Sequence, residues 1–310
     1  MGKILSLGDV AWLLHHILPL PWMYRLARLH GRVVHLLNRE KRAIVARNLG
    51  PFAKDSKDLR RMTRQFFELR QVRVLMVVLF LDMDPDKWEE HFAIDGVAHL
   101  DQALSHQKGV ILLGSHLNSL GGFMALMILK RRGYDIAVAL PSDAELYPQT
   151  VFGRRLRRRT DTESLKQRMG GFYVQFNVRP IIKKLAGNGV IGQTGDGWHS
   201  VSFARVPFLG RSLPFTTGMM SVAQSTGAMI VPLNVVGRPP YMRAEISPPF
   251  QVPKGENPEE DLTEAVAAYT RTLERALREN VVCWEHWLIA DTLETMDAWT
   301  DRPLRDRYEL

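Results

Sequence analysis

The stretch GVILLGSHLNSLGG, residues 109–122, joins a strand-like run to a helix-like run through a histidine. Val110–Leu113 is unbroken apolar sequence, which is typical of a strand buried on both faces of a parallel sheet. The pattern predicts a helix from about Ser119 to Arg132. His116 would then lie at the carboxyl end of a strand, where open α/β sheets bind ligands, beside a helix N-terminus that favours a neutral imidazole. These residues alone leave open whether His116 is catalytic or structural.

Strand-like and helix-like segments continue to alternate on the carboxyl side of this stretch. Further strands are expected at 135–140, 172–176, 190–193, 229–236 and 241–246, and helices at 180–186, 217–225 and 262–277. This alternation predicts an α/β fold with a central, mostly parallel sheet flanked by helices. We therefore expect three regions, which are a basic helical N-terminal region (1–90), an α/β domain (91–290) and a C-terminal tail (291–310).

Positive charge is concentrated in the N-terminal region. The chain has 310 residues and a formal net charge of +8, and Arg25–Arg73 holds fourteen Lys or Arg against four acids. Such a balance suggests lipid headgroups, nucleic acid or an acidic protein as partner, although a solvated helical face has the same composition. The apolar stretch Val10–Tyr24 is interrupted by prolines and is short for a membrane span, so it indicates either an interfacial segment or a packed helix.

Histidine and cysteine usage gives no sign of a metal site. Cys283 is the single cysteine, which excludes a disulfide framework and a cysteine-rich metal centre. The ten histidines do not show the His-x3-His or His-Glu-x-x-His spacing of zinc sites. We therefore expect no bound metal.

Four segments, taken in order, resemble a known family. They are RNL (47–49), DGVAHLDQALSHQKGVILLGSHLNSLGG (95–122), QTGDGWHSVSFARVPFLGRSLPFTTGMMSVAQSTGAMIVPLNVV (193–236) and CWEHWL (283–288). Together they resemble the lysophospholipid acyltransferase superfamily, in particular its lipid A lauroyl/myristoyl acyltransferase branch. The resemblance spans most of residues 10–290.

The resemblance implies transfer of an acyl chain from a thioester of acyl carrier protein or CoA to a hydroxyl of a lipid or glycolipid. His116 would be the general base that takes the proton of the attacking hydroxyl. The thioester would be a co-substrate, and no cofactor is expected. The implied location is the cytoplasmic face of a bacterial cytoplasmic membrane, with the chain bound as a peripheral or monotopic protein at an anionic surface.

The chain departs from the family pattern at one position. The family places Asp or Glu five residues after the histidine, and Gly121 stands there, followed by Gly122. Candidates for a substitute that orients His116 are Asp196, preferred because it too should follow a strand, then Asp143 and Glu145, and the neutral side chains of Asn118 and Ser119. A further alternative is a non-catalytic relative that binds lipid or acyl carrier.

Binding residues are expected around these candidates. The glycine pair would leave space for a bulky acceptor, and two arginines flank VPFLG as candidate headgroup contacts. The candidate substrate-binding residues are Asn118, Ser119, Gly121, Arg205 and Arg211. The candidate carrier or headgroup contacts are Arg154, Arg155, Arg157, Arg158 and Arg159 in RRLRRR, a pattern shared by ordinary solvated surfaces. Nucleic acid is not an expected partner, because no nucleic-acid-reading module accompanies the charge.

Overall fold

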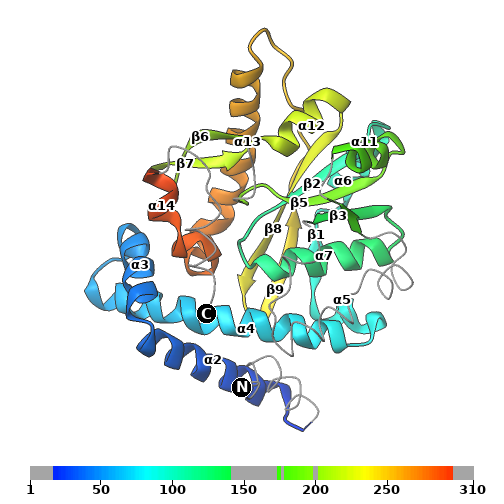
Figure 1. Ribbon diagram of the computed structural model, residues 1–310. Helices are drawn as coiled ribbons and strands as arrows, with labels where there is room; N and C mark the ends of the chain where they lie inside the picture. Colours follow the sequence, from blue (N-terminus) through cyan, green and yellow to red (C-terminus); the bar gives the residue numbers. More distant parts are fainter. Residues whose placement is uncertain (1–16, 141–172, 176–177, 198–201, 296–310) are drawn as a thin grey trace, which may run out of the picture.

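The structure is a computed structural model that describes residues 17–140, 173–175, 178–197 and 202–295 (Figure 1). Within these residues a seven-stranded sheet has the order β1-β9-β8-β2-β5-β3-β4. Its strands are β1 (Ala93–Asp95), β2 (Val110–Gly114), β3 (Ile136–Leu140), β4 (Tyr173–Gln175), β5 (Val190–Thr194), β8 (Met229–Arg238) and β9 (Tyr241–Ile246). The β8–β9 pair is antiparallel and the other five pairings are parallel. The expected α/β fold with a mostly parallel central sheet is confirmed.

Helices cover both faces of this sheet. They are α5 (Trp88–His91), α6 (Val97–Ser105), α7 (Ser119–Arg131), α11 (Val178–Ala186), α12 (Gly218–Thr226) and α13 (Pro258–Glu279). Ile111 and Leu113 of β2 belong to the core shared with α11, α12 and α13. Val110 and Leu112 belong to the core shared with α6 and α7. The strand is therefore apolar at every one of these positions because neither face meets water.

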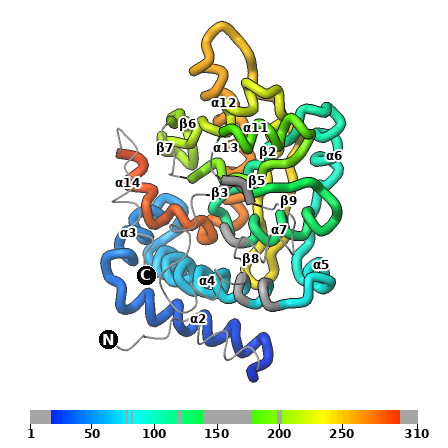
Figure 2. The backbone as a smooth tube through the Cα atoms, turned by 45° about the vertical axis from the view of Figure 1, so that its right-hand side comes forward, coloured from blue at the N-terminus to red at the C-terminus, as the bar shows by residue number. Residues whose placement is uncertain are grey.

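The N-terminal region is helical in its described part, as expected. It consists of α2 (Leu20–Leu37), α3 (Arg39–Leu49), the 3₁₀ turn η1 (Gly50–Phe52), α4 (Ser56–Asp82) and the 3₁₀ turn η2 (Pro85–Lys87). Helix α2 lies along α4 in both views of the molecule (Figures 1 and 2). The contact is made by a narrow face of α2, where Met23, Ala27 and Gly31 are buried. A Cβ at Gly31 would lie 2.5 Å from the carbonyl oxygen of Phe67, so only glycine permits this approach.

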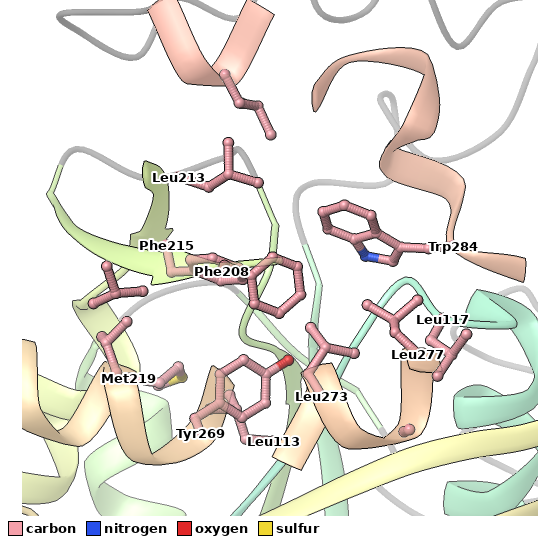
Figure 3. Packing of buried hydrophobic residues seen from close by; sticks show 14 of the residues in the cluster. Leu113, Leu117, Phe208, Leu213, Phe215, Met219, Tyr269, Leu273, Leu277 and Trp284 are labelled. Atoms are coloured by element: carbon pink, nitrogen blue, oxygen red, sulfur yellow. The ribbon is translucent and has the colours of Figure 1, made fainter. Parts of the chain in front are cut away.

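Several elements were not predicted from the sequence. They are the hairpin β6 (Phe203–Phe208) and β7 (Arg211–Thr216), the 3₁₀ turns η3 (Val281–Cys283) and η4 (Glu285–Leu288), and the short helix α14 (Ala290–Thr295). In the core, Phe208 of the hairpin packs against Phe215 and against the indole of Trp284, and Tyr269 of α13 belongs to the same cluster (Figure 3). The C-terminal segment, which comprises η3, η4 and α14 (residues 281–295), therefore reaches back to the centre of the molecule. None of the helices in the described ranges is long and apolar enough to span a bilayer.

Candidate active site

His116 lies in the turn between β2 and α7, at the carboxyl end of the sheet. Its side chain is 21% exposed, whereas the next two residues, Leu117 and Asn118, are fully buried. The imidazole is thus held by a rigid turn and still reaches the surface. This is the location that the strand-like run before it predicted.

Asp196 is brought to this turn by the strand next to β2. The parallel pairing of β2 with β5 ends at Gly114 and Thr194, and the N–H of Gly195 donates to the carbonyl of Gly114 at 2.9 Å. Asp196, which follows Gly195, therefore lies beside Ser115 and His116, which follow Gly114. Sequence reasoning placed Asp196 first among the substitutes for the missing acid, on the ground that it too follows a strand.

The Asp196 carboxylate contacts His116 twice. Its Oδ1 lies 2.8 Å from Nδ1 of the imidazole, and its two oxygens accept the main-chain N–H of His116 at 3.0 and 2.8 Å. A carboxylate at Nδ1 selects the neutral tautomer that carries its proton on Nδ1. Nε2 is then the nitrogen without a proton, as a general base requires.

The electrostatics of the pair follow from burial and from mutual contact. Burial alone would raise the pKa of Asp196, but the two neighbouring histidines and the donated hydrogen bonds hold that pKa far below its usual range. Burial also disfavours a charged His116, and the Asp196 carboxylate outweighs this cost, so the pKa of His116 is raised. The Asp196 carboxylate therefore makes Nε2 of His116 more basic, whereas the sequence predicts an environment that favours the neutral imidazole.

Two residues of the C-terminal segment complete the cluster, and neither was predicted. The indole Nε1 of Trp284 donates to Asp196 Oδ2 at 2.9 Å, and Nε2 of His286 hydrogen-bonds the main-chain carbonyl of Asp196. The His286 ring lies 4.5 Å from the His116 ring, centroid to centroid. Burial lowers the pKa of His286 to about 4, so this second imidazole is neutral at pH 7. The segment CWEHWL contained these residues, but nothing local in it indicated which strand end they would meet.

Three of these residues bring possible metal ligands close together. One ligand atom from each of His116, Asp196 and His286 lies within 4.8 Å of the others. Hydrogen bonds already explain the cluster, because Nδ1 of His116 faces the carboxylate and Nε2 of His286 faces a carbonyl. A metal ion would have to replace these bonds, so the arrangement fits a hydrogen-bonded dyad better than a metal centre.

The sequence profile of the bacterial lipid A biosynthesis acyltransferases matches residues 2–290. The chain belongs to this family. No curated protein matches it closely enough to count as a relative. Among solved structures, the 1-acyl-sn-glycerophosphate (LPA) acyltransferase PlsC of Thermotoga maritima matches with 15% identity and a TM-score of 0.39. That alignment covers 83% of this chain and 95% of the other.

Gly121 shows why this acyltransferase-family chain has no acid at the family position. Gly121 is buried in the first turn of α7, and a Cβ added there would lie 2.7 Å from Cγ1 of Val235 in β8. The expectation that this glycine leaves room for an acceptor is therefore wrong, because Val235 fills that space. A Cβ on Gly122 would come no nearer than 3.9 Å to another side chain. An acid at position 121 has no place, and Asp196 contacts the imidazole instead.

Asn118 does not orient His116. Its Nδ2 donates to the carbonyls of Val235 and Gly237 at 3.0 and 3.2 Å, and its own N–H donates to the carbonyl of Cys283 at 3.1 Å. The residue joins the start of α7 to β8 and to the C-terminal segment, with a positive φ of 48°. The alternative in which its amide replaces the family acid is therefore wrong. Ser119 begins α7, and its side chain is not among the described ones.

The two candidate headgroup arginines bind other parts of the protein. Arg205 donates to the carbonyls of Ser212 and Glu294, and Arg211 donates to the side chain of Asn48 at 2.9 Å. Asn48, in the RNL segment, also donates to the carbonyl of Trp287. These contacts join the hairpin, α3 and the C-terminal segment, so both arginines have structural contacts, and their contact with a headgroup stays a prediction.

Other candidates lie outside the described residues. They are Asp143, Glu145, Arg154, Arg155, Arg157, Arg158 and Arg159.

Proposed function

We propose that this chain transfers an acyl group from an acyl thioester to a hydroxyl of a lipid or glycolipid, with His116 as the general base. The observation that supports it is the His116–Asp196 pair, 2.8 Å apart at the carboxyl end of the central strands. The donor would be acyl carrier protein or CoA charged with a fatty acid, and no cofactor takes part. Membership of an acyltransferase family supports the reaction class.

The chemistry assigns one task to each member of the pair. As the acceptor oxygen attacks the thioester carbonyl carbon, Nε2 of His116 takes its proton. The C–O bond forms, the C–S bond breaks, and the thiolate leaves with the proton returned by the imidazolium. Asp196 stays ionised throughout, stabilises the imidazolium and keeps the Nδ1 proton in place, as the aspartate does in a serine-hydrolase triad.

A non-catalytic relative that binds lipid or acyl carrier is the alternative suggested by Gly121. The argument for this alternative was the missing family acid. It is weaker in the structure, because the Asp196 carboxylate, which follows another strand, contacts the imidazole. Such a protein would bind a fatty acyl carrier tightly and would turn over nothing.

The proposed location is the cytoplasmic face of a bacterial cytoplasmic membrane, and α2 is the element that supports it. An apolar stripe at intervals of three or four residues faces solvent on this helix, and it consists of Trp22, Leu26, Leu29, Val33 and Leu36. At 100° per residue, Arg25, Arg28 and Arg32 follow one flank of the stripe. An apolar face bordered by arginines fits an interfacial helix on anionic lipid.

Activity is tested with the full chain, lauroyl-acyl carrier protein or lauroyl-CoA as donor, and bacterial membrane lipid extract as acceptor. Mass spectrometry should find an acylated lipid, and His116→Ala should lower its rate by a factor of about 10²–10⁴. His91→Ala, which changes an exposed histidine on α5, serves as the matched control and should leave the rate unchanged. Undiminished product with His116→Ala would refute the mechanism, and donor binding without product would favour the non-catalytic alternative.

A further inference from the structure

The C-terminal segment pairs with the turn that carries His116. The main-chain N–H of Glu285 donates to the carbonyl of His116 at 3.2 Å, and Leu117 forms an antiparallel bridge with Trp284. The carbonyl of Cys283 accepts the N–H of Asn118, at the start of α7. Residues 283–285 thus run beside residues 116–118, and the Trp284 indole reaches Asp196, two residues beyond the end of β5.

The Asp196 carboxylate receives donors from two directions. His116 supplies its imidazole N–H to Oδ1 and shares its main-chain N–H between both oxygens. The indole of Trp284 supplies the donor that comes from outside the His116 turn, and it bonds Oδ2 at 2.9 Å. Without the indole, Oδ2 would retain the shared main-chain bond, and the carboxylate plane would be free to rotate away from Nδ1.

We infer that Trp284 is a positioning residue, whose indole N–H fixes the Asp196 carboxylate in the orientation that holds the Nδ1 proton of His116. The inference rests on the proposed function for its catalytic meaning. His286 supports the same arrangement from the main-chain side, by its bond to the carbonyl of Asp196. The chain thereby completes from its C-terminus a site whose family acid is absent from α7.

The charges around His116 make a neutral donor the suitable choice. Asp196 and Glu285 both act on the imidazole, and Glu285 is itself paired with Arg70 and Arg73. His286 is neutral at pH 7, with a pKa that burial lowers to about 4. A cationic donor in place of Trp284 would compete with the imidazolium for the carboxylate, whereas an indole holds the carboxylate without cancelling its charge.

A purely structural role for Trp284 is the competing explanation. Trp284 is buried and packs on Phe208, with 5.4 Å between ring centroids (Figure 3). Trp287 offers a matched comparison, because it is equally buried and its indole donates to the carbonyl of Val281. Trp284→Phe and Trp287→Phe each remove one indole N–H from the same aromatic cluster, and only the first removes a donor to Asp196.

The test measures the imidazole directly. Full-length protein with ¹⁵N-labelled histidine is titrated by NMR, and the His116 signals are identified by their loss in His116→Gln. In Trp284→Phe the His116 titration should move to lower pH, because a carboxylate that is free to rotate away from Nδ1 stabilises the imidazolium less. Its acyl-transfer rate should fall about tenfold, as is common when a supporting hydrogen bond is lost. In Trp287→Phe the titration should stay at its wild-type position.

A second measurement needs no substitution at the site. In the wild-type protein the indole N–H signal of Trp284 should shift as His116 titrates, because both groups share one carboxylate, while the Trp287 signal stays constant. A wild-type titration curve in Trp284→Phe, a shift to higher pH, or an indole signal that does not change during the titration would overturn the inference. None of these readouts needs a substrate, so a failure of acyl transfer would refute the proposed function and leave this result interpretable.

Discussion

At the scale of single residues, Gly121 and Gly122 are neighbours in α7 with opposite surroundings. A Cβ on Gly121 would lie 2.7 Å from Val235 Cγ1, whereas one on Gly122 meets nothing closer than 3.9 Å. We expect Gly121→Ala to lower the free energy of unfolding by about 1–3 kcal/mol through overpacking. Gly122→Ala should raise it by up to ~1 kcal/mol, because alanine is the better helix former. Urea denaturation of both variants measures the difference.

Val235 provides the control for this explanation. If the loss of stability in Gly121→Ala comes from contact with the Val235 methyl groups, the double variant Gly121→Ala/Val235→Ala should lose less free energy of unfolding than the two single variants lose together. Additive effects, or a Gly121→Ala protein as stable as Gly122→Ala, would contradict the contact. By the same argument Gly121→Glu should destabilise the protein without restoring a family-type site.

The sequence located part of this site and missed the rest for a physical reason. His116 and Asp196 could be found because each follows a buried strand, and parallel neighbours bring their carboxyl ends to one edge. Trp284 and His286 depend on how a C-terminal segment pairs with a turn far away in the chain. The hydrogen-bond partners of Asn118 and of the two arginines could not be predicted for the same reason, because tertiary contacts that local sequence does not encode set the partner of a polar residue.

At the scale of elements, the C-terminal segment is attached to α4 by a buried ion cluster. Glu285 bonds Arg70 at 2.9 Å and also Arg73, whose side chain is 1% exposed. Burial would raise the pKa of Glu285, but the two arginines lower it to about 2. Glu285→Gln leaves Arg73 charged and uncompensated in the interior, and we expect it to cost about 3–5 kcal/mol of stability. Urea or thermal denaturation at pH 7 measures this loss.

An exposed ion pair supplies the control for Glu285. Glu89 of α5 accepts two bonds from Arg132 at the surface, at 3.0 and 2.8 Å. Glu89→Gln removes the same charge from the same kind of residue, and it should cost less than ~1 kcal/mol because water screens the pair. Equal losses in the two variants would show that the buried cluster does not hold the segment.

The elements that could be predicted from the sequence are the strands and helices whose apolar residues recur regularly because one or both of their faces are buried. The central strands read as apolar runs because helices cover both sides, and α13 read as an amphipathic helix because one side meets water. The β6–β7 hairpin carries a proline in each strand, and η3 and η4 are too short for a period. These elements are stabilised by packing on α13 and α3, so their existence follows from the tertiary structure.

At the scale of the whole molecule, His286 links stability to pH. Burial is the main cause that lowers its pKa from 6.5 to about 4, so the unfolded chain binds a proton first as the pH falls. Above pH 6.5 the His286 imidazole is neutral in both states and the free energy of unfolding is unaffected. As the pH falls from 6.5 towards 4, protonation of the unfolded chain lowers the free energy of unfolding by up to about 3 kcal/mol. His116 acts in the opposite direction, because its raised pKa favours the protonated form in the folded state.

His286→Gln should therefore reduce the loss of stability between pH 7 and pH 4.5, since an amide does not titrate. Thermal denaturation at the two pH values measures the difference, with His91→Gln on the surface of α5 as the control. A loss in His286→Gln as large as in the wild-type protein would contradict the assignment of this pH dependence to the buried imidazole.

The way the molecule would lie on a membrane involves more than α2. Tyr241, the first residue of β9 after the turn from β8, is 87% exposed. Burial raises the pKa of Tyr24 on α2, and the nearby Tyr241 contributes to the same rise, to about 12. Tyr241 therefore lies close to α2. The end of β8 that leads into this turn is bonded to the start of α7, through the carbonyl of Gly237 and the side chain of Asn118. A surface formed by α2 and this turn would therefore place the membrane on the side of the molecule that is connected to the His116 helix.

This orientation predicts that distant residues act on one binding equilibrium. Leu29→Glu in the α2 stripe should weaken binding to phosphatidylglycerol-containing vesicles at least tenfold, because it removes apolar contact and adds repulsion. Tyr241→Ser should weaken binding in the same sedimentation assay, although it lies more than two hundred residues away. Ile182→Glu and Val178→Ser make equivalent changes at exposed apolar positions of α11 and should have no effect. If the α11 variants lose as much vesicle binding, the loss reflects general hydrophobicity and not a defined surface. If Leu29→Glu weakens binding and Tyr241→Ser does not, the membrane-binding surface is limited to α2.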